Sequence, residues 1–154
     1  MYGLAASLTA IFAPLLFIHS LQPTQFSSNA SSNSSFTFNN RTYNFTYVAV
    51  TEQQQEQGLM NKSVNASTFE LFKFSSPGIY PFWMKNTYYP LDMIWVYNST
   101  VVYIANATPC VWRSKDQTNC TVYVPNSIAD SVIESESGFV NRTGLRVGDE
   151  VNIK

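Results

Sequence analysis

The sequence predicts a mainly β fold, a small sandwich or barrel-like domain with one or two short helices, preceded by an N-terminal hydrophobic helix. Three observations predict this class. Aromatic residues make up 15% of the chain, with 9 Tyr and 11 Phe, and such residues favour strands. Short segments of alternating polarity recur, and turn-forming pairs separate several of them. A length of 154 residues leaves room for one modest core.

Residues 1–21 contain no Lys, Arg, Asp or Glu and are mostly apolar. This composition predicts a signal peptide or a membrane anchor. Pro14 and the short length favour cleavage, whereas the lack of a clear small-x-small site favours retention. Residues 22–35 end in a Ser/Asn-rich stretch that predicts a solvated linker. Residues 36–154 are then expected to form a single β-rich extracellular domain.

The predicted domain begins with a hairpin and a short helix. An Asn39-Asn40 turn is followed by alternating residues, which predicts that four side chains share one strand face: Tyr43, Phe45, Tyr47 and Ala49. Residues 51–57 are rich in Glu and Gln, with Thr51 suited to capping and Gly58 suited to ending a helix.

The remaining elements are predicted to be short strands joined by turns. Asn98-Ser99 is expected to turn the chain between two of them, and residues 138–142 are expected to form one helical turn. The predicted strands are residues 69–74, 80–84, 91–97, 101–104, 121–124, 131–136 and 150–153.

Asparagine is concentrated in Asn-x-Ser/Thr sequons. Ser and Thr together make up 31 of 154 residues, so chance would place about three asparagines in such triplets. Ten of the 14 lie in them, which predicts a densely N-glycosylated chain outside the cell. The sequons start at Asn29, Asn33, Asn40, Asn44, Asn61, Asn65, Asn98, Asn106, Asn119 and Asn141.

Cys110 and Cys120 are the two cysteines of the chain. In an extracellular protein, this spacing predicts one disulfide that closes a short loop. A reactive thiol or a metal ligand is the alternative.

Residues 81–95 hold the densest set of candidate binding groups. On a strand, Trp83 and Lys85 point one way and Phe82 and Met84 the other, so one face can be core while the other presents a platform for a ligand. Asp92 would share its face with apolar residues and therefore needs a partner. Lys85, Arg146, or the backbone amides around Asn86 and Thr87 could provide it. Asp92 could cap a loop, bind a ligand or act in catalysis.

Several chemistries are excluded or disfavoured. The one histidine, His19, lies in the leader, so Ser-His-Asp and Cys-His sites are not expected. Glu134 and Glu136 share a strand face, and we interpret them as surface glutamates rather than as a catalytic pair. No cofactor and no metal are expected. The net charge of −1 provides no basic field for nucleic acid.

Five motifs follow one another in a fixed order along the chain. They are Gln57-Gly58-Leu59-Met60, Phe82-Trp83-Met84-Lys85-Asn86-Thr87, Pro90-Leu91-Asp92, the two cysteines, and Gly144 to Val151 with Val147-Gly148-Asp149. With these motifs the chain resembles the domain-of-unknown-function 192 family of exported bacterial and archaeal proteins over residues 48–153. The resemblance implies a compact, mainly β domain without an established activity.

The chain departs from the family pattern at two places. Gln57 stands where the family usually has Arg, and Phe69-Glu70-Leu71-Phe72 stands where it usually has Gly-Met-Leu-Phe. Gln57 lacks a charge that could pair with Asp92. In its high sequon density and its few charged residues, the chain is similar to archaeal cell-surface glycoproteins. Because few carboxylates are available to form ion pairs, protonation in acid should lower the free energy of unfolding only a little.

These observations favour a non-catalytic, N-glycosylated cell-surface or secreted domain, a subunit or accessory component of an extracellular or membrane-associated assembly. Its expected partners are N-linked glycans, a membrane contacted through residues 1–21, and other proteins or further copies of the chain. One alternative is a small-ligand or glycan-binding module that uses four residues: Trp83, Lys85, Asn86 and Asp92. Another is an enzyme with Asp92 and Lys85 in a pocket.

Overall fold

A computed structural model describes residues 33–111 and 120–154. These residues form a mainly β fold with two short helices, as predicted. The predicted leader, most of the predicted linker, and the sequons at Asn29 and Asn119 lie outside the described residues. No helix within the described ranges has the length and apolar character needed to span a membrane.

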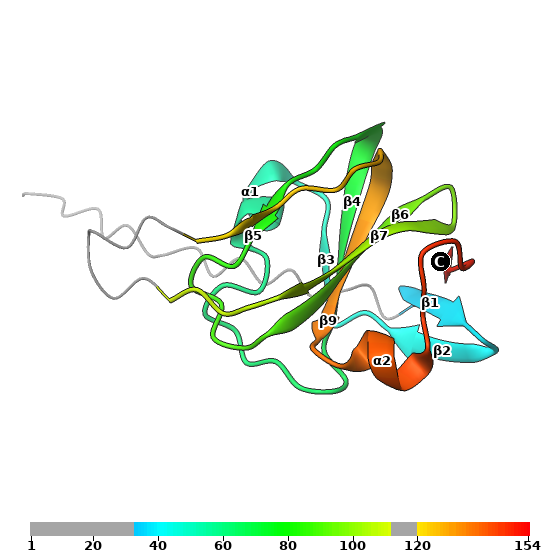
Figure 1. The fold of residues 1–154 in the computed structure, drawn as a ribbon, viewed down its shortest axis with the longest axis horizontal. Helices are drawn as coiled ribbons and strands as arrows, with labels where there is room; N and C mark the ends of the chain where they lie inside the picture. The colour runs from blue at the N-terminus through cyan, green and yellow to red at the C-terminus, as the bar shows by residue number, and fades with distance from the viewer. Residues whose placement is uncertain (1–32, 112–119) are drawn as a thin grey trace, which may run out of the picture.

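A five-stranded sheet forms the centre of the domain (Figure 1). Adjacent strands of this sheet run antiparallel, except for the pair at one edge, β3 and β4, which runs parallel. In spatial order the strands are β3 (Tyr47–Ala49), β4 (Phe69–Gly78), β9 (Ala129–Glu136), β6 (Leu91–Tyr97) and β7 (Thr100–Ala107).

Two smaller sheets and two helices complete the described chain. The three-stranded sheet has the order β10 (Asn152–Ile153), β1 (Ser35–Phe38), β2 (Arg41–Asn44), and a ribbon pairs β5 (Phe82–Trp83) with β8 (Val122–Tyr123). The helices are α1 (Glu52–Gln57) and α2 (Phe139–Thr143). Figure 1 shows β1, β2 and α2 on one side of the central sheet and α1 with β5 on the other. The barrel-like alternative is wrong, because the central sheet keeps two open edges at β3 and β7 among the described residues.

Strand alternation creates a separate hydrophobic core on each face of the central sheet. Along β6, Ile94 and Val96 belong to one cluster, whereas Met93 and Trp95 belong to the other, and all four are at most 1% exposed. Both faces of β6 are therefore covered, which agrees with its unbroken apolar run from Met93 to Val96.

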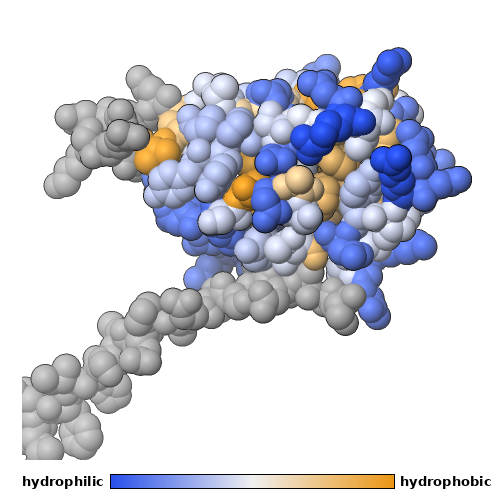
Figure 2. All heavy atoms as spheres, turned by 90° about the horizontal axis from the view of Figure 1, so that it is seen from below, coloured by the Kyte–Doolittle hydropathy of each residue, from blue (hydrophilic) through white to orange (hydrophobic). Residues whose placement is uncertain are grey.

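The cluster under the three-stranded sheet is rich in aromatic side chains. Phe36 stacks on Tyr43 with ring centres 5.0 Å apart, and Phe139 of α2 meets Phe69 edge-on at 5.1 Å. Such pairs add to the stabilisation from burial alone. Viewed from below, where α2 and β2 lie, the surface is mostly hydrophilic and its hydrophobic residues form small separate spots (Figure 2).

The predicted second strand of the first hairpin is divided between two sheets. Tyr43 and Phe45 pack in the cluster of β1, whereas Tyr47 and Ala49 pack in the opposite cluster. The expectation that these four residues share one strand face is therefore wrong. The chain leaves the hairpin after Asn44 and enters the central sheet at Tyr47, so the alternation belongs to two short strands.

The predicted turns and disulfide are present. Asn39 and Asn40 have φ of 48° and 58°, and Asn98 and Ser99 have φ of 47° and 62°. These positive values are typical of two-residue hairpin turns, where Asn is favoured. Cys110 and Cys120 form a disulfide with Cα atoms 5.7 Å apart.

Candidate functional site

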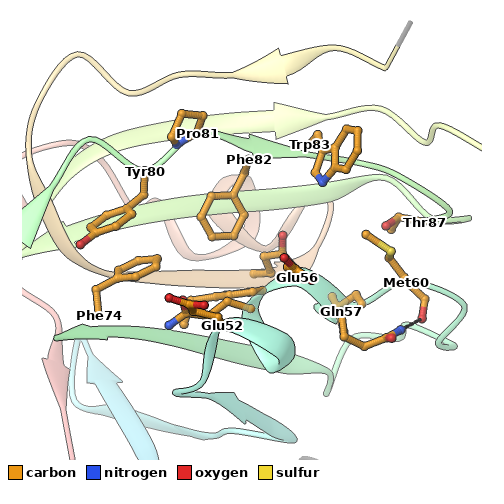
Figure 3. A pocket seen from close by; sticks show the side chains of 14 residues that line it. Glu52, Glu56, Gln57, Met60, Phe74, Tyr80, Pro81, Phe82, Trp83 and Thr87 are labelled. Atoms are coloured by element: carbon orange, nitrogen blue, oxygen red, sulfur yellow. Dashed lines mark hydrogen bonds between the residues drawn. The ribbon is translucent and has the colours of Figure 1, made fainter. Parts of the chain in front are cut away.

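A cavity of about 350 Å³ lies between α1 and the segment that enters β5. It opens on the face of the central sheet opposite α2, and Figure 3 shows its walls. Aromatic side chains form one wall, helix α1 forms the other, and strand side chains close the bottom. The lining residues with apolar or aromatic side chains are Leu59, Met60, Phe72, Phe74, Tyr80, Pro81, Phe82 and Trp83.

The aromatic wall is held by contacts between its own rings and the core. Phe74 and Tyr80 stack with ring centres 3.5 Å apart, at one end of the cavity (Figure 3). Phe82 packs edge-on against buried Trp95 at 5.6 Å, and the Trp95 Nε1–H donates to the Tyr80 carbonyl at 2.9 Å. Because Trp95 is fully buried, this bond anchors the wall to the sheet.

Trp83 forms the outer part of the same wall and is 43% exposed. The Lys85 Nζ lies 5.1 Å from the centre of its ring. Phe82 and Met84, on either side of Trp83, pack in the core. The predicted alternation along this strand is confirmed, and an exposed aromatic ring therefore stands at the mouth of the cavity.

Helix α1 forms the opposite wall, and local signals determine its limits. Thr51 Oγ1 accepts from the Gln54 N–H at 3.3 Å, and Gln54 Oε1 accepts from the Thr51 N–H at 3.1 Å, which completes a capping box. Gly58 ends the helix with φ of 44°, and a Cβ there would lie 3.2 Å from the Phe72 ring. The helix therefore sits close to the sheet and lines the cavity with four polar residues: Glu52, Gln55, Glu56 and Gln57.

Glu134 of β9 lies at the bottom of the cavity and is only 4% exposed. Its cross-strand neighbour is Glu70 of β4, which is 0% exposed. Residues opposite each other in an antiparallel pair point to the same face. Two acidic side chains are therefore buried side by side under the cavity. We call Glu70 and Glu134 the glutamate pair.

Within residues 33–111 and 120–154, one cation, Lys62, compensates the glutamate pair. Lys62 Nζ lies 3.6 Å from Glu70 Oε1 and 3.8 Å from the centre of the Tyr47 ring. Neither carboxyl oxygen of Glu70 has a hydrogen-bond partner, and no hydrogen bond or ion pair of Glu134 occurs within the described residues. Burial of carboxyl groups with so little compensation is costly unless they bind a proton or another cation.

Burial also changes the proton affinity of the pair. Loss of hydration raises the pKa of Glu70 to about 7, although Lys62 opposes the shift. Burial and the adjacent Glu70 raise the pKa of Glu134 well above its usual range. Perturbed acids at a cavity are typical of functional sites.

Asp92 lies on the other face of the sheet, in the cluster of α2. Its Oδ2 accepts from the backbone N–H groups of Gly138 at 3.0 Å and Val140 at 2.9 Å, and its Oδ1 accepts from Asn106 Nδ2 at 2.8 Å. Asp92 therefore holds the first turn of α2. The predicted need for a partner is confirmed, but the suggested partners are wrong. Asp92 is bound neither by Lys85 or Arg146 nor by the amides around Asn86 and Thr87.

Two of the other candidate residues, Lys85 and Asn86, lie beside Cys110 of the disulfide. Lys85 and Asn86 are half-buried, and the Asn86 N–H donates to the Cys110 carbonyl at 2.8 Å. The structure thus brings Trp83, Lys85 and Asn86 together along one segment, whereas it places Asp92 on the α2 side. Gln57 lines the cavity and also lies apart from Asp92.

The expectation that Glu134 is a surface residue is wrong. Glu136 is half-exposed and pairs with Arg142 at 3.5 Å, as a surface glutamate would. Glu134 instead lies under the cavity, paired with a residue 64 positions earlier in the chain. The one signal in the sequence was Glu70 between Phe69 and Leu71, a carboxyl group within an apolar strand.

Each sequon asparagine within the described residues is exposed. Asn40 and Asn98 lie in hairpin turns, where a glycan would meet little of the protein. Asn106 differs, because its Nδ2 donates to Asp92 at 2.8 Å and to Ser137 Oγ at 2.7 Å.

Fold and site together define a small β domain with an aromatic cavity over a buried acidic pair. A family model, DUF192 ("Uncharacterized ACR, COG1430"), matches residues 36–153. The chain belongs to this family. The match includes the first hairpin, which the sequence resemblance left out. A comparison with curated proteins found no match.

Two solved structures are similar over most of their length. A protein of unknown function from Novosphingobium aromaticivorans DSM 12444 is 28% identical with a TM-score of 0.63, over 77% of this chain and 82% of that one. A "putative transcription regulator" from Sinorhizobium meliloti 1021 is 31% identical with a TM-score of 0.63, over 78% of this chain and 90% of that one. Both support the fold.

Proposed function

We propose that this chain is a non-catalytic, N-glycosylated extracellular domain that binds a small organic ligand in the cavity between α1 and β5. The observation that carries the proposal is the cavity itself, about 350 Å³, with aromatic side chains on one wall and polar side chains of α1 on the other. Cavities of this size and lining are typical of small-ligand sites. Exposed Trp83 at its mouth supplies a flat surface on which a ring can stack.

An enzymatic role through Asp92 and Lys85 is less well supported. Asp92 is engaged by two backbone amides and Asn106, which leaves it as a structural acceptor. Glycoside hydrolysis by the glutamate pair would need both acids to flank the cleft. Glu134 lines the cavity, whereas Glu70 is not among the lining residues.

A role as a subunit of a membrane-associated assembly is the second candidate. Apolar side chains on β8 and after it favour it, because Val122 and Val124 are each 53% exposed and Ile128 is 45% exposed. Val122 lies opposite exposed Trp83 in the β5–β8 ribbon, and exposed apolar groups of this kind are suited to contact with a protein partner. The DNA-related name of one structural relative is not extended to this chain, whose net charge is −1.

A thermal-unfolding screen tests the cavity proposal. Oligosaccharides, short peptides and aromatic amines would be added to the glycosylated chain, to Trp83→Ala, and to Tyr97→Ala as a matched control outside the cavity. We expect at least one class to raise the unfolding temperature of the wild type and of the Tyr97 variant, with a smaller rise for the Trp83 variant. No rise with any class, or equal rises in all three proteins, would overturn the proposal.

A further inference from the structure

We propose that the ligand of this cavity is an organic cation, with an apolar or aromatic body and an ammonium or guanidinium group that reaches Glu134. This inference rests on the proposed ligand-binding function and specifies the chemical class of the ligand. It follows from the charge of the lining, the lack of a partner for Glu134 among the described residues, and the nature of the walls.

Among the described residues, the lining of the cavity carries acids but no base. Glu52, Glu56 and Glu134 contribute carboxyl groups, and no Lys or Arg of the described residues lines the cavity. Lys62 is directed to Glu70 and the Tyr47 ring instead. An anionic ligand would therefore meet charges of its own sign, whereas a cation would meet complementary ones.

Glu134 is the group that gives the cavity its specificity. It is 96% removed from solvent, lines the bottom, and makes no hydrogen bond or ion pair with a described residue. Its cross-strand neighbour Glu70 already takes Lys62, the one lysine at the pair among the described residues. The glutamate pair is thus one cation short, and a ligand ammonium placed over Glu134 would supply it.

The walls fit the rest of such a ligand. Phe82 projects into the space between Tyr80 and Trp83, opposite α1 (Figure 3). Aromatic faces attract cations as well as rings, so they accept both the body and the charged end of the ligand. A neutral sugar could stack on Trp83, but it would bring no cation to the buried carboxyl group of Glu134.

Two probes of nearly equal shape separate charge from shape. The affinities of 2-phenylethylamine and 2-phenylethanol would be measured by calorimetry on the glycosylated chain at about pH 8, where the amine is charged. We expect the amine to bind about tenfold more tightly or better, as for a charge-assisted hydrogen bond. Equal affinities would overturn the cation assignment while leaving ligand binding intact. If neither probe binds, the cation assignment is overturned as well.

Variants on one strand locate the charge. Glu134→Gln keeps the shape and removes the ionisable carboxyl group. Glu136→Gln changes a half-exposed residue of the same strand that pairs with Arg142. The amine should lose about tenfold in affinity with the first variant and keep it with the second. An unchanged affinity in Glu134→Gln would overturn the role of Glu134, and the comparison of the two probes on the wild type needs no variant to fold.

Discussion

Glu70 and Glu134 face each other across β4 and β9, both buried, with Lys62 as their nearby cation. The glutamate pair lies directly beneath the aromatic cavity, because Glu134 also forms the bottom of that cavity. It links the proposed binding site to the stability of the sheet, since β9 is central and pairs with β4 and β6. A change of protonation here should therefore be visible in both binding and unfolding.

The first prediction concerns stability and pH. The pKa of Glu70 is about 7 in the folded chain and near 4.5 when unfolded. Below pH 4.5 both states hold the proton, and between 4.5 and 7 only the folded state does, so the free energy of unfolding falls as pH rises through this window. The pKa shift of Glu70 corresponds to a loss of about 3 kcal/mol in the free energy of unfolding across this window. The raised pKa of Glu134 adds a loss in the same direction.

Urea unfolding at about pH 5 and about pH 8 checks this prediction. The wild type should be more stable at the lower pH, which agrees with the expectation that acid costs this chain little. The Glu70→Gln, Glu134→Gln double variant should lose most of the difference. Greater stability of the wild type at the higher pH would show that the pair is not held protonated.

The second prediction concerns Asp92. Asp92→Asn keeps the size but weakens the bonds from Gly138 and Val140, so the free energy of unfolding should fall by about 1–3 kcal/mol. Binding in the cavity should be unchanged, because Asp92 lies on the other face. Chemical denaturation and the probe affinity measure the two effects. Lost binding in a folded Asp92 variant would instead place Asp92 in the site.

The sequence predicts the local elements better than it predicts the site. The strand at residues 91–97 is present with the same limits, since continuous burial and flanking turns define it. The helix that begins after Thr51 and the turn at Asn98 also follow from local chemistry. The glutamate pair does not, because it depends on which strands become neighbours. Glu134 by itself has the pattern of a solvent-facing residue.

The third prediction concerns the disulfide. Cys110 and Cys120 are 10 residues apart, so their link should contribute about 2.5 kcal/mol by restricting the unfolded chain. The Cys110→Ser, Cys120→Ser double variant should unfold at a lower temperature in a calorimetric scan. It should keep its affinity for the cavity probe, because neither cysteine lines the cavity. Unfolding temperatures that agree within error would contradict this contribution.

The fourth prediction concerns glycan occupancy. Asn106 uses its Nδ2 for two hydrogen bonds, to Asp92 and to Ser137, whereas attachment of a glycan replaces one of its two hydrogens. We therefore expect Asn40 and Asn98 to carry glycans and Asn106 to remain largely free. Mass spectrometry of glycopeptides from the natural source measures this directly. High occupancy at Asn106 with an intact fold would show that the bond to Ser137 is dispensable.

The most direct test of the central claim is a heteronuclear NMR titration of the chain with 2-phenylethylamine. The account predicts saturable shifts of the Trp83 indole and of the backbone amides of Phe82 and Glu134, with Gly138 and Val140 on the α2 side unaffected. Shifts confined to the α2 side, or no saturable shifts at all, would contradict a cation site in this cavity.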